Sequence, residues 1–260
     1  AMYNTGLQAH LAIQAGGTPL DTWQTSLFSA LGLGFSPDSI TACIIHGALY
    51  FLPVYIVGMA IGGIWEVLFA VVRGHEVTEG FLVTSALLPL ILPATIPLWQ
   101  VALGMSFGVV IGKEVFGGVG MNILNPALCA RAFLFFAYPA QISGDKPWIA
   151  ANFIDVDGFS GATWLGQAAA AIPTSSNPLS ELNWMDAFWG TIPGSMGETS
   201  VFACLIGAAI LIITQIGSWR TMAGITAGTF LMATTLNSIG SDTNAMFQLP
   251  FMWHLSLIHI

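Results

Sequence analysis

Charged side chains are scarce in this sequence. Only 7% of its 260 residues are charged, whereas 55% are hydrophobic and the mean hydropathy is +0.78. A soluble domain typically carries about 25% charged residues, so this chain lacks the polar groups needed to cover a surface in water. The composition excludes an ordinary soluble domain and predicts an all-α polytopic membrane protein that contacts lipid.

Basic residues, cysteine motifs and the common catalytic motifs are also lacking. Five Lys and Arg stand against 13 Asp and Glu, and a net charge of -8 excludes binding to the phosphates of nucleic acids. The cysteines Cys43, Cys129 and Cys204 lie in apolar runs without CxxC spacing, which predicts packing rather than a metal site. The sequence contains no Walker loop, nucleophile elbow or dinucleotide-binding glycine pattern, so we assign no catalytic residue and no metal ligand.

What is present is a series of apolar runs. A membrane-spanning helix needs about 20 mostly apolar residues, and the sequence predicts about seven transmembrane or re-entrant helices. The second and third runs are short and rich in Pro and Gly, so one of them is expected to be broken or re-entrant. The seven runs are Cys43–Val72, Phe81–Pro97, Leu98–Ile111, Ile123–Tyr138, Val201–Ser218, Met222–Ser238 and Met246 to the end.

Long polar segments separate the apolar runs into groups. If Arg73, Lys113 and Arg220 mark the cytoplasmic side, alternation places the segment of Lys146 on the opposite side, as the positive-inside rule favours. We therefore expect long extracytoplasmic loops with ordered turns. The predicted organisation is a loop segment at 1–40, a first helix bundle at 41–139, a loop at 140–200 and a second, truncated helix group at 201–260.

A carboxylate in the first apolar run is a candidate functional group. Gly62 and Gly63 thin the predicted helix for a flat ligand or a neighbouring helix, and Glu66 follows on nearly the same face as Gly62. An unpaired ionised carboxylate is costly in a membrane, which favours a role in an ion or proton pathway. Alternatively, Glu66 lies near the interface and pairs with Arg73 or extends to the headgroups.

A cation inside the fourth run is the second candidate. Asn125 and Pro126 predict the start of a helix. The positive N-terminal end of that helix can face an anion, or the segment can serve only to pack closely against another helix. Arg131 then lies within the span, where an unpaired cation costs at least ~2.5 kcal/mol. We interpret Arg131 as a cofactor-binding or ion-pairing cation, with Glu114 or a flavin or quinone polar group as its partner.

The segment "DGFSGAT" is the most polar stretch of the second loop. Asp157 and Gly158 form a turn signal, and Ser160 and Gly161 place Thr163 where an enzyme can reach its hydroxyl. The alternative is that Ser160 or Thr163 caps a short helix. The residues alone leave both interpretations open.

This segment resembles the flavin-attachment sequence used by bacterial flavin transferases. "GKEVFGGVGMNILNPALCARAFLFFAYPAQISGDKPW", "AMYNTG" and "YIVGMAIGGIWEVLFAVVRGHEVTEG" resemble the B subunits of Na+-translocating NADH:quinone reductases, and the similarity runs from about Ala1 to Leu255. The resemblance implies membership of a six-subunit translocase of the bacterial inner membrane. Electrons from NADH would pass through other subunits to ubiquinone, coupled to Na+ export.

The resemblance also implies roles for individual residues. FMN would be joined through its phosphate to Thr163, with Asp157, Gly158, Ser160 and Gly161 as the attachment motif that the transferase recognises. That loop would be periplasmic, because the transferase works outside the cytoplasm. The quinone region would include Gly62 and Gly63, Glu66 would belong to the sodium pathway, and riboflavin would be a second cofactor.

Two other functions remain open from the sequence. The chain could be the D subunit of the related Rnf complex, which shares the threonine–flavin motif, or a transporter or channel without redox chemistry. The family protein is longer at both ends, so we expect a fragment. Its start without Met and its terminal "SLIHI" agree with that expectation.

Overall fold

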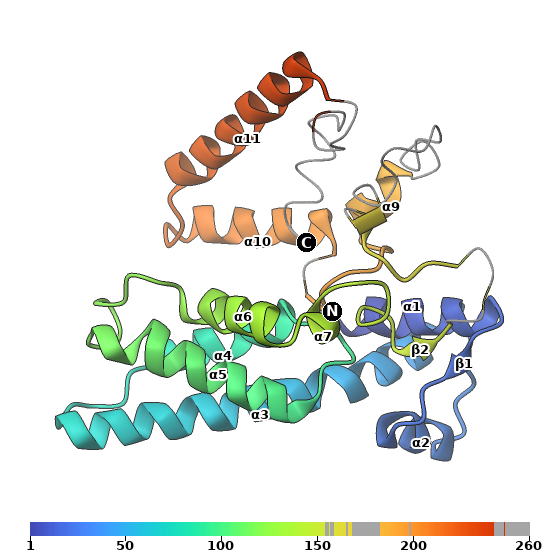
Figure 1. Ribbon diagram of the computed structural model, residues 1–260, viewed down its shortest axis with the longest axis horizontal. Coiled ribbons are helices and arrows are strands. Elements are labelled where there is room, and N and C mark those ends of the chain that lie inside the picture. The colour runs from blue at the N-terminus through green and yellow to red at the C-terminus, as the bar shows by residue number, and fades with distance from the viewer. Residues whose placement is uncertain are drawn as a thin grey trace. The chain divides into compact units, whose positions relative to one another are not determined.

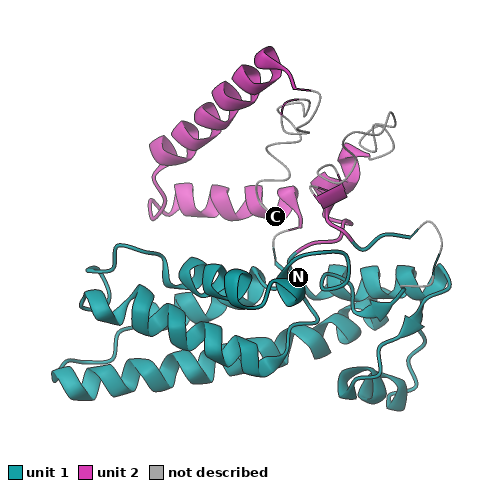
Figure 2. Ribbon diagram, viewed as in Figure 1, with its two compact units in different colours: residues 1–161, 195–197 teal, residues 162–194, 198–260 magenta. Residues whose placement is uncertain are grey.

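The computed structural model divides into two compact units, which Figure 2 distinguishes by colour. Unit 1 contains residues 1–161 and 195–197, and unit 2 contains 162–194 and 198–260. The structure describes residues 1–153, 156, 159–164, 166–167, 183–197, 199–241 and 247.

The described parts of both units are mainly helical (Figure 1). In unit 1, β1 and β2 pair antiparallel, with Thr18 opposite Asn152 and Pro19 opposite Ala151. The elements of unit 1 are α1 (Met2–Gln14), β1 (Thr18–Pro19), α2 (Trp23–Ala30), α3 (Ile40–Arg73), α4 (Gly80–Leu90), α5 (Leu98–Gly112), the 3-10 helix η1 (Glu114–Phe116), α6 (Pro126–Ala137), α7 (Pro139–Ile142) and β2 (Ala151–Asn152). Those of unit 2 are α9 (Trp184–Trp189), α10 (Val201–Ile213) and α11 (Trp219–Ile239).

Helix α3 is the longest element and organises unit 1. The hydroxyl of Ser39 accepts the N–H of Ala42 at its start, and Gly74 ends it in the left-handed conformation with φ 72°. Its 34 residues extend about 50 Å, more than the thickness of a bilayer's hydrocarbon core. Helix α3 is therefore long enough to cross a membrane and to project beyond it.

Most predicted apolar runs correspond to helices, but their lengths differ. In the part of the chain that the structure describes, α3 and the continuous stretch Leu98–Phe116 are long and apolar enough to cross a membrane. Helices α4, α6 and α10 are apolar but shorter. The seventh run lies almost wholly outside the described residues, so the count of seven spans stays a prediction.

The second predicted run is interrupted. Helix α4 ends at Leu90, and the backbone is irregular until α5 begins at Leu98. The side chain of Leu92 is fully buried, and the N–H groups of Met196 and Gly197 donate to the carbonyls of Leu92 and Leu90 at 3.1 and 2.8 Å. The irregular backbone between α4 and α5 is thus surrounded by protein and hydrogen-bonded. Irregular backbone is tolerated at membrane depth only under these conditions or where it lines a cavity.

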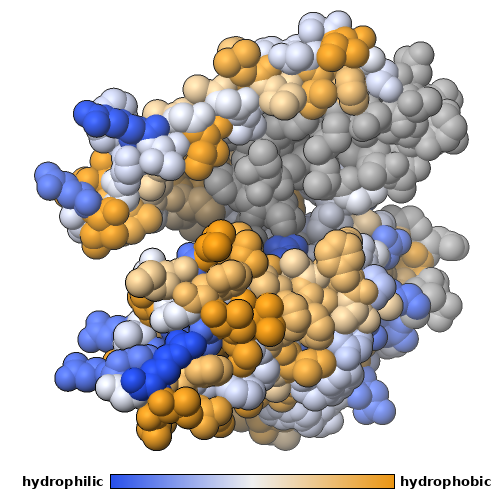
Figure 3. Space-filling view, turned by 60° about the vertical axis from the view of Figure 1, so that its left-hand side comes forward, coloured by the Kyte–Doolittle hydropathy of each residue, from blue (hydrophilic) through white to orange (hydrophobic). Residues whose placement is uncertain are grey.

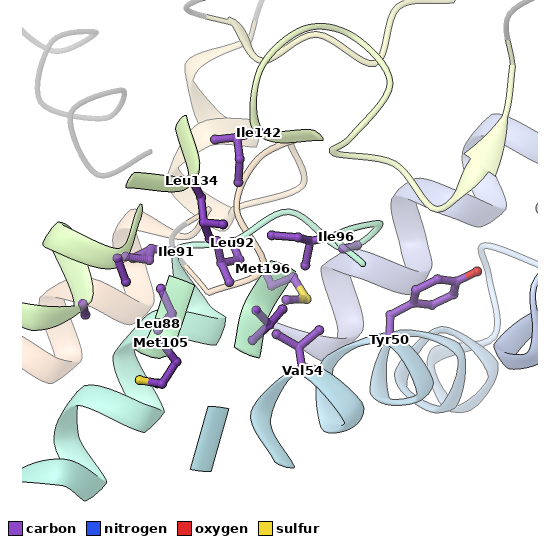
Figure 4. Packing of buried hydrophobic residues seen from close by; sticks show 14 of the residues in the cluster. Tyr50, Val54, Leu88, Ile91, Leu92, Ile96, Met105, Leu134, Ile142 and Met196 are labelled. Carbon is purple, nitrogen blue, oxygen red and sulfur yellow. The ribbon is translucent and has the colours of Figure 1, made fainter. Parts of the chain in front are cut away.

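The core of unit 1 lies where α3, α4, α5 and α6 meet. Figure 4 shows side chains from these helices converging with those of the irregular segment. Close approach depends on small residues: a Cβ at Gly108 would lie 2.3 Å from the carbonyl oxygen of Pro126 on α6. The labelled members are Tyr50, Val54, Leu88, Ile91, Leu92, Ile96, Met105, Leu134, Ile142 and Met196.

Many large apolar side chains lie on the surface instead. Ile56, Ile64 and Val71 of α3 are 61%, 61% and 75% exposed, and Figure 3 shows several groups of apolar residues, in orange, on the visible face of unit 1, with hydrophilic residues between and beside them. A soluble monomer rarely exposes so many large apolar side chains together. The distribution agrees with a protein whose helices face lipid.

The segment 1–40 contains more regular structure than its polar composition indicates. Helix α1 packs closely on α3, because a Cβ at Gly6 or Gly47 would lie 2.0 or 1.8 Å from a carbonyl oxygen of the other helix. The hydroxyl of Thr22 accepts the N–H of Thr25 and caps α2. This segment is therefore part of the packed unit.

Candidate functional site: a buried charge cluster

The carboxylate of Glu66 is buried in unit 1, with its side chain 2% exposed. One oxygen, Oε2, forms an ion pair with the ammonium of Lys113, whose side chain is 3% exposed. The other, Oε1, accepts the hydroxyl of Thr78 and the backbone N–H of Thr78, the latter at 3.3 Å. Both oxygens are therefore hydrogen-bonded, as a carboxylate inside an apolar helix group requires.

The cluster extends from Lys113 to a second acid. The ammonium of Lys113 also lies 3.4 Å from Oε1 of Glu114, and the guanidinium of Arg73 donates to Oε2 of Glu114 at 2.8 Å. Arg73 also donates to the backbone carbonyl of Glu114 and lies over the ring of Phe69. Two carboxylates and two cations form one connected network, which we call the charge cluster (Glu66, Arg73, Lys113 and Glu114).

Two chain segments bring the charge cluster together. Glu66 and Arg73 stand two turns apart on α3, and Lys113 and Glu114 follow the end of α5. Gly117, Gly118 and Gly120 then reverse the chain with φ values of 117°, 97° and 86°, which side chains other than glycine rarely adopt. The ion pairs of Arg73 with Glu114 and of Glu66 with Lys113 show that the ends of α3 and α5 lie side by side.

The cluster's charges balance, which allows Glu66, Lys113 and Glu114 to be buried, while the side chain of Arg73 is 31% exposed. Two carboxylates and two cations sum to zero, and each buried charge has an opposite charge within hydrogen-bonding reach or close to it. Breaking a buried pair by removing one partner typically costs about 3–5 kcal/mol, because the other charge is left uncompensated. The cluster is thus sensitive to any change in the charge of one member.

The ion-pair partners of Glu66 and Glu114 in the structure differ from those expected from the sequence. Glu66 pairs with Lys113 rather than with Arg73, and the carboxylate of Glu114 contacts Arg73 and Lys113. Arg131 is half-buried on α6, and its role as a cofactor-binding or ion-pairing cation stays a prediction. The one available sequence signal was the adjacent pair Lys113 and Glu114, charged residues at the end of an apolar run.

Gly62 and Gly63 lie on different faces of α3. Gly62 is buried, and a Cβ there would lie 2.6 Å from the hydroxyl of Ser85 on α4. Gly63 instead lines an open apolar groove of about 830 Å³ on the outer side of α3. The groove is lined by Met59, Ala60, Gly63, Ile64, Val67, Leu68, Val71 and Phe81.

The attachment motif is described only in part. Asp157 and Gly158 lie outside the described residues, whereas Ser160 is exposed and Gly161 is buried in unit 1. Thr163 is half-buried in unit 2, and its hydroxyl oxygen accepts the N–H of Gly166 at 3.2 Å. Thr163 thus makes the hydrogen bond expected of a helix cap, and this contact does not test whether it carries a flavin.

A second buried polar group joins α1 to α3. The rings of His10 and His46 stack with centroids 5.1 Å apart, and Nδ1–H of His10 donates to the carbonyl of Ser36 at 3.0 Å. Burial lowers the pKa of His10, and the hydrogen bond to Ser36 acts in the opposite direction. No sequence pattern indicated this pairing, because the two residues are far apart along the chain.

The charge cluster resembles no metal centre. Among the described residues, no three His, Cys, Asp or Glu side chains are grouped so that they could hold a metal ion. The cluster's carboxylates are occupied by cationic side chains, and its oxygen atoms face an ammonium group.

Comparison with known proteins shows the chain's relationships. Residues 1–257 match the family described as "NQR2, RnfD, RnfE family". A protein from Chromohalobacter salexigens, named as the B subunit of a Na(+)-translocating NADH-quinone reductase, is 58% identical over 260 residues. Proteins of the same name from Pseudoalteromonas atlantica and Azotobacter vinelandii are 57% and 55% identical.

The matches cover this chain more completely than they cover its relatives. Each aligned region includes 98% of this chain but only 61% of the Chromohalobacter protein and 62% of the other two. The chain thus spans about three fifths of the length of these relatives. The family match, over residues 1–257, runs through both units.

Proposed function

This chain belongs to the NQR2, RnfD, RnfE family, and we propose that it is part of the B subunit of a Na+-translocating NADH:quinone reductase. The observation that carries the proposal is 55–58% identity over 98% of the chain to proteins of that name. In this function, electrons pass from NADH through other subunits to ubiquinone, and the free energy released drives Na+ export. The protein is embedded in the bacterial inner membrane.

The proposed cofactor is FMN attached to the hydroxyl of Thr163. A phosphoester link would prevent loss of the cofactor and leave the isoalloxazine ring to supply the redox chemistry. The protein's residues would hold the ring and set its surroundings, and Ser160 and Gly161, with Asp157 and Gly158, would present the threonine to a flavin transferase. The exposed position of Ser160 and the half-buried position of Thr163 agree with access from the loop surface.

The flavin assignment is tested by expressing the full-length protein with a flavin transferase. Wild type is expected to show in-gel flavin fluorescence and an FMN mass increment on the peptide that contains Thr163. Thr163→Ala should lose both signals. Thr191→Ala, which changes an exposed threonine of the same loop, should keep them, and equal signals in all three proteins would refute covalent attachment at Thr163.

The proposed quinone region lies at Gly62 and Gly63. The apolar groove beside Gly63 suits a hydrophobic ring or tail, while the tight contact at Gly62 holds α3 against α4. We assign riboflavin as a second cofactor and Arg131 as a cation that binds a cofactor or an acid. These assignments extend the family resemblance to residues of this chain.

The proposed sodium pathway includes Glu66. Its burial and its position one turn from Gly62 support that assignment, and the oxygen atoms of Glu66, Thr78 and Glu114 are of the type that Na+ binds. The partners of the chain would be ubiquinone, Na+, lipid, the other subunits and, during maturation, the flavin transferase. The loop that carries Thr163 would face the periplasm. Arg73, Lys113 and Arg220 stand at the other ends of the predicted spans, and the positive-inside rule favours the cytoplasmic side for those ends.

The second candidate is the D subunit of an Rnf complex, which belongs to the same family description. The names of the relatives favour the quinone reductase. NADH-dependent quinone reduction by the assembled complex would support the first function, and ferredoxin-dependent NAD+ reduction would support the second. Ion flux by a protein without covalent flavin and without either activity would support a transporter or channel.

A further inference from the structure

The ammonium of Lys113 occupies a position between two carboxylates. It pairs with Glu66 and lies 3.4 Å from Oε1 of Glu114, and its side chain is 3% exposed. The hydroxyl of Thr78 bonds to the same carboxylate of Glu66. The ammonium is therefore placed between oxygen atoms of two carboxylates, one of which is also bonded to Thr78.

The charge balance limits what else can bind there. With both acids ionised and both bases protonated, the cluster has no net charge. An added Na+ would leave one uncompensated positive charge beside the buried carboxylates, which is unfavourable although the fourth member, Arg73, is 31% exposed. Na+ can therefore take oxygen ligands at Glu66 only if a positive charge leaves as it arrives.

Lys113 is the member best suited to leave. Arg73 is held at Glu114 by bonds to both the carboxylate and the backbone carbonyl, and its guanidinium remains charged. Lys113 contacts the acids through its terminal ammonium on a flexible four-carbon chain. It caps the end of α5, where its N–H donates to the carbonyl of Val109, and rotation about its side-chain bonds moves the ammonium without changing that contact.

We propose that Lys113 is a tethered cation that occupies the oxygen site of Glu66 and Glu114 and is exchanged one for one with Na+. The proposal rests on the proposed role of Glu66 in the sodium pathway and makes Lys113 a positioning residue for it. When Lys113 lies at the acids, Na+ is excluded. When its ammonium turns away, the two carboxylates and the hydroxyl of Thr78 become available to Na+.

The test is the Na+ dependence of NADH-driven quinone reduction by the assembled complex. Na+ should be varied at constant ionic strength with choline, and covalent flavin should be measured to confirm assembly. Lys113→Gln removes the competing charge, so the half-saturating Na+ concentration is expected to fall about tenfold, which corresponds to ~1.4 kcal/mol. A value that is unchanged or higher in an assembled complex would overturn the proposal.

Two further variants keep the test decisive. Lys113→Arg keeps a permanent charge that can bind a carboxylate at two points, so the half-saturating Na+ concentration should rise. If the complex with Lys113→Gln does not assemble, Lys113→Arg decides the test. An unchanged or lower half-saturating Na+ concentration in Lys113→Arg would then contradict the proposed exchange of Lys113 with Na+. Lys146→Gln, which removes an exposed lysine, is the matched control and should leave the Na+ dependence unchanged.

Glu66→Gln separates this proposal from the function on which it rests. If Glu66→Gln leaves the Na+ response unchanged, the assignment of Glu66 to the pathway fails. If Glu66→Gln alters the response but neither Lys113 variant does, only the exchange fails. A purely structural Lys113 would change the amount of assembled complex without changing the half-saturating Na+ concentration.

Discussion

Glu66 illustrates how a charged residue can be stable within an apolar helix. Its two oxygens bind Lys113 and Thr78, so the carboxylate is compensated without access to water. The sequence indicated that an acid here needed a partner, because ionised groups are costly at this depth. It could not identify Lys113, which lies 47 positions along the chain and approaches only after α5 packs beside α3.

Replacement of the Glu66 carboxylate by an amide tests both its charge and its proposed role. Glu66→Gln leaves Lys113 with Glu114 as its acidic partner, and we expect the assembled protein to lose up to about 3–5 kcal/mol of stability. The Na+ dependence of turnover should weaken because an anionic ligand is lost. Enzyme kinetics at varied Na+ and thermal unfolding of the purified complex measure the two effects.

The matched control for this variant is Glu76→Gln. Glu76 is an exposed acid in the turn after α3, so its replacement should change neither Na+ dependence nor thermal stability beyond about 0.5 kcal/mol. An equal response in both variants would mean that net charge, rather than the buried site, controls the Na+ dependence.

At the scale of elements, the predicted runs and the observed helices agree best where the signal is local. The Asn125–Pro126 signal marks the start of α6, where the Asn125 side chain accepts the N–H groups of Ala127 and Leu128. Gly74 ends α3 for an equally local reason. Helix α1 was not predicted, because its 13 residues carry a weak apolar pattern and its stability depends on α3.

The contact between α1 and α3 makes a prediction for Gly47. A Cβ at this position would lie 1.8 Å from the carbonyl oxygen of Met2, a backbone atom that cannot move independently. Gly47→Ala should therefore separate the helices and lower stability by about 3 kcal/mol. Thermal unfolding of the purified complex in detergent, followed by intrinsic fluorescence, measures the change.

Gly58→Ala provides the control within the same helix. Its added Cβ would meet Cε of Met105 at 3.5 Å, an ordinary contact, and alanine favours a helix over glycine by up to about 1 kcal/mol. This variant should be neutral or slightly more stable. If Gly47→Ala behaved in the same way, the close packing of α1 on α3 would be wrong.

At the scale of the whole molecule, the apolar surface and the family relationship point to the same environment. Large side chains are exposed on α3 in unit 1 and on α10 in unit 2, where Ile213 is 79% exposed. Such surfaces are stable in lipid and would associate in water. Together with the family, they identify a membrane-embedded protein, although the chain spans only about three fifths of its relatives.

The proposed orientation can be tested at Thr191. In full-length protein without its native cysteines, Thr191→Cys places a single thiol on an exposed position of the second loop. A membrane-impermeant maleimide should label it in intact spheroplasts if the loop is periplasmic. Labelling only after the membrane is opened would reverse the orientation, and Arg220→Cys serves as the control for the opposite side.

Composition, apolar runs and turn residues determined the class of this protein and its main helices, whereas the flavin motif was implied only by the family resemblance. These properties are carried by single residues or short windows, because hydropathy, caps and positive φ values depend on local chemistry. Only the tertiary structure decided that Lys113 meets Glu66, that Arg73 holds Glu114, and that Gly62 and Gly63 serve different faces. The physical reason is that these contacts arise between helices distant in the chain, where packing brings charges together that no local pattern relates.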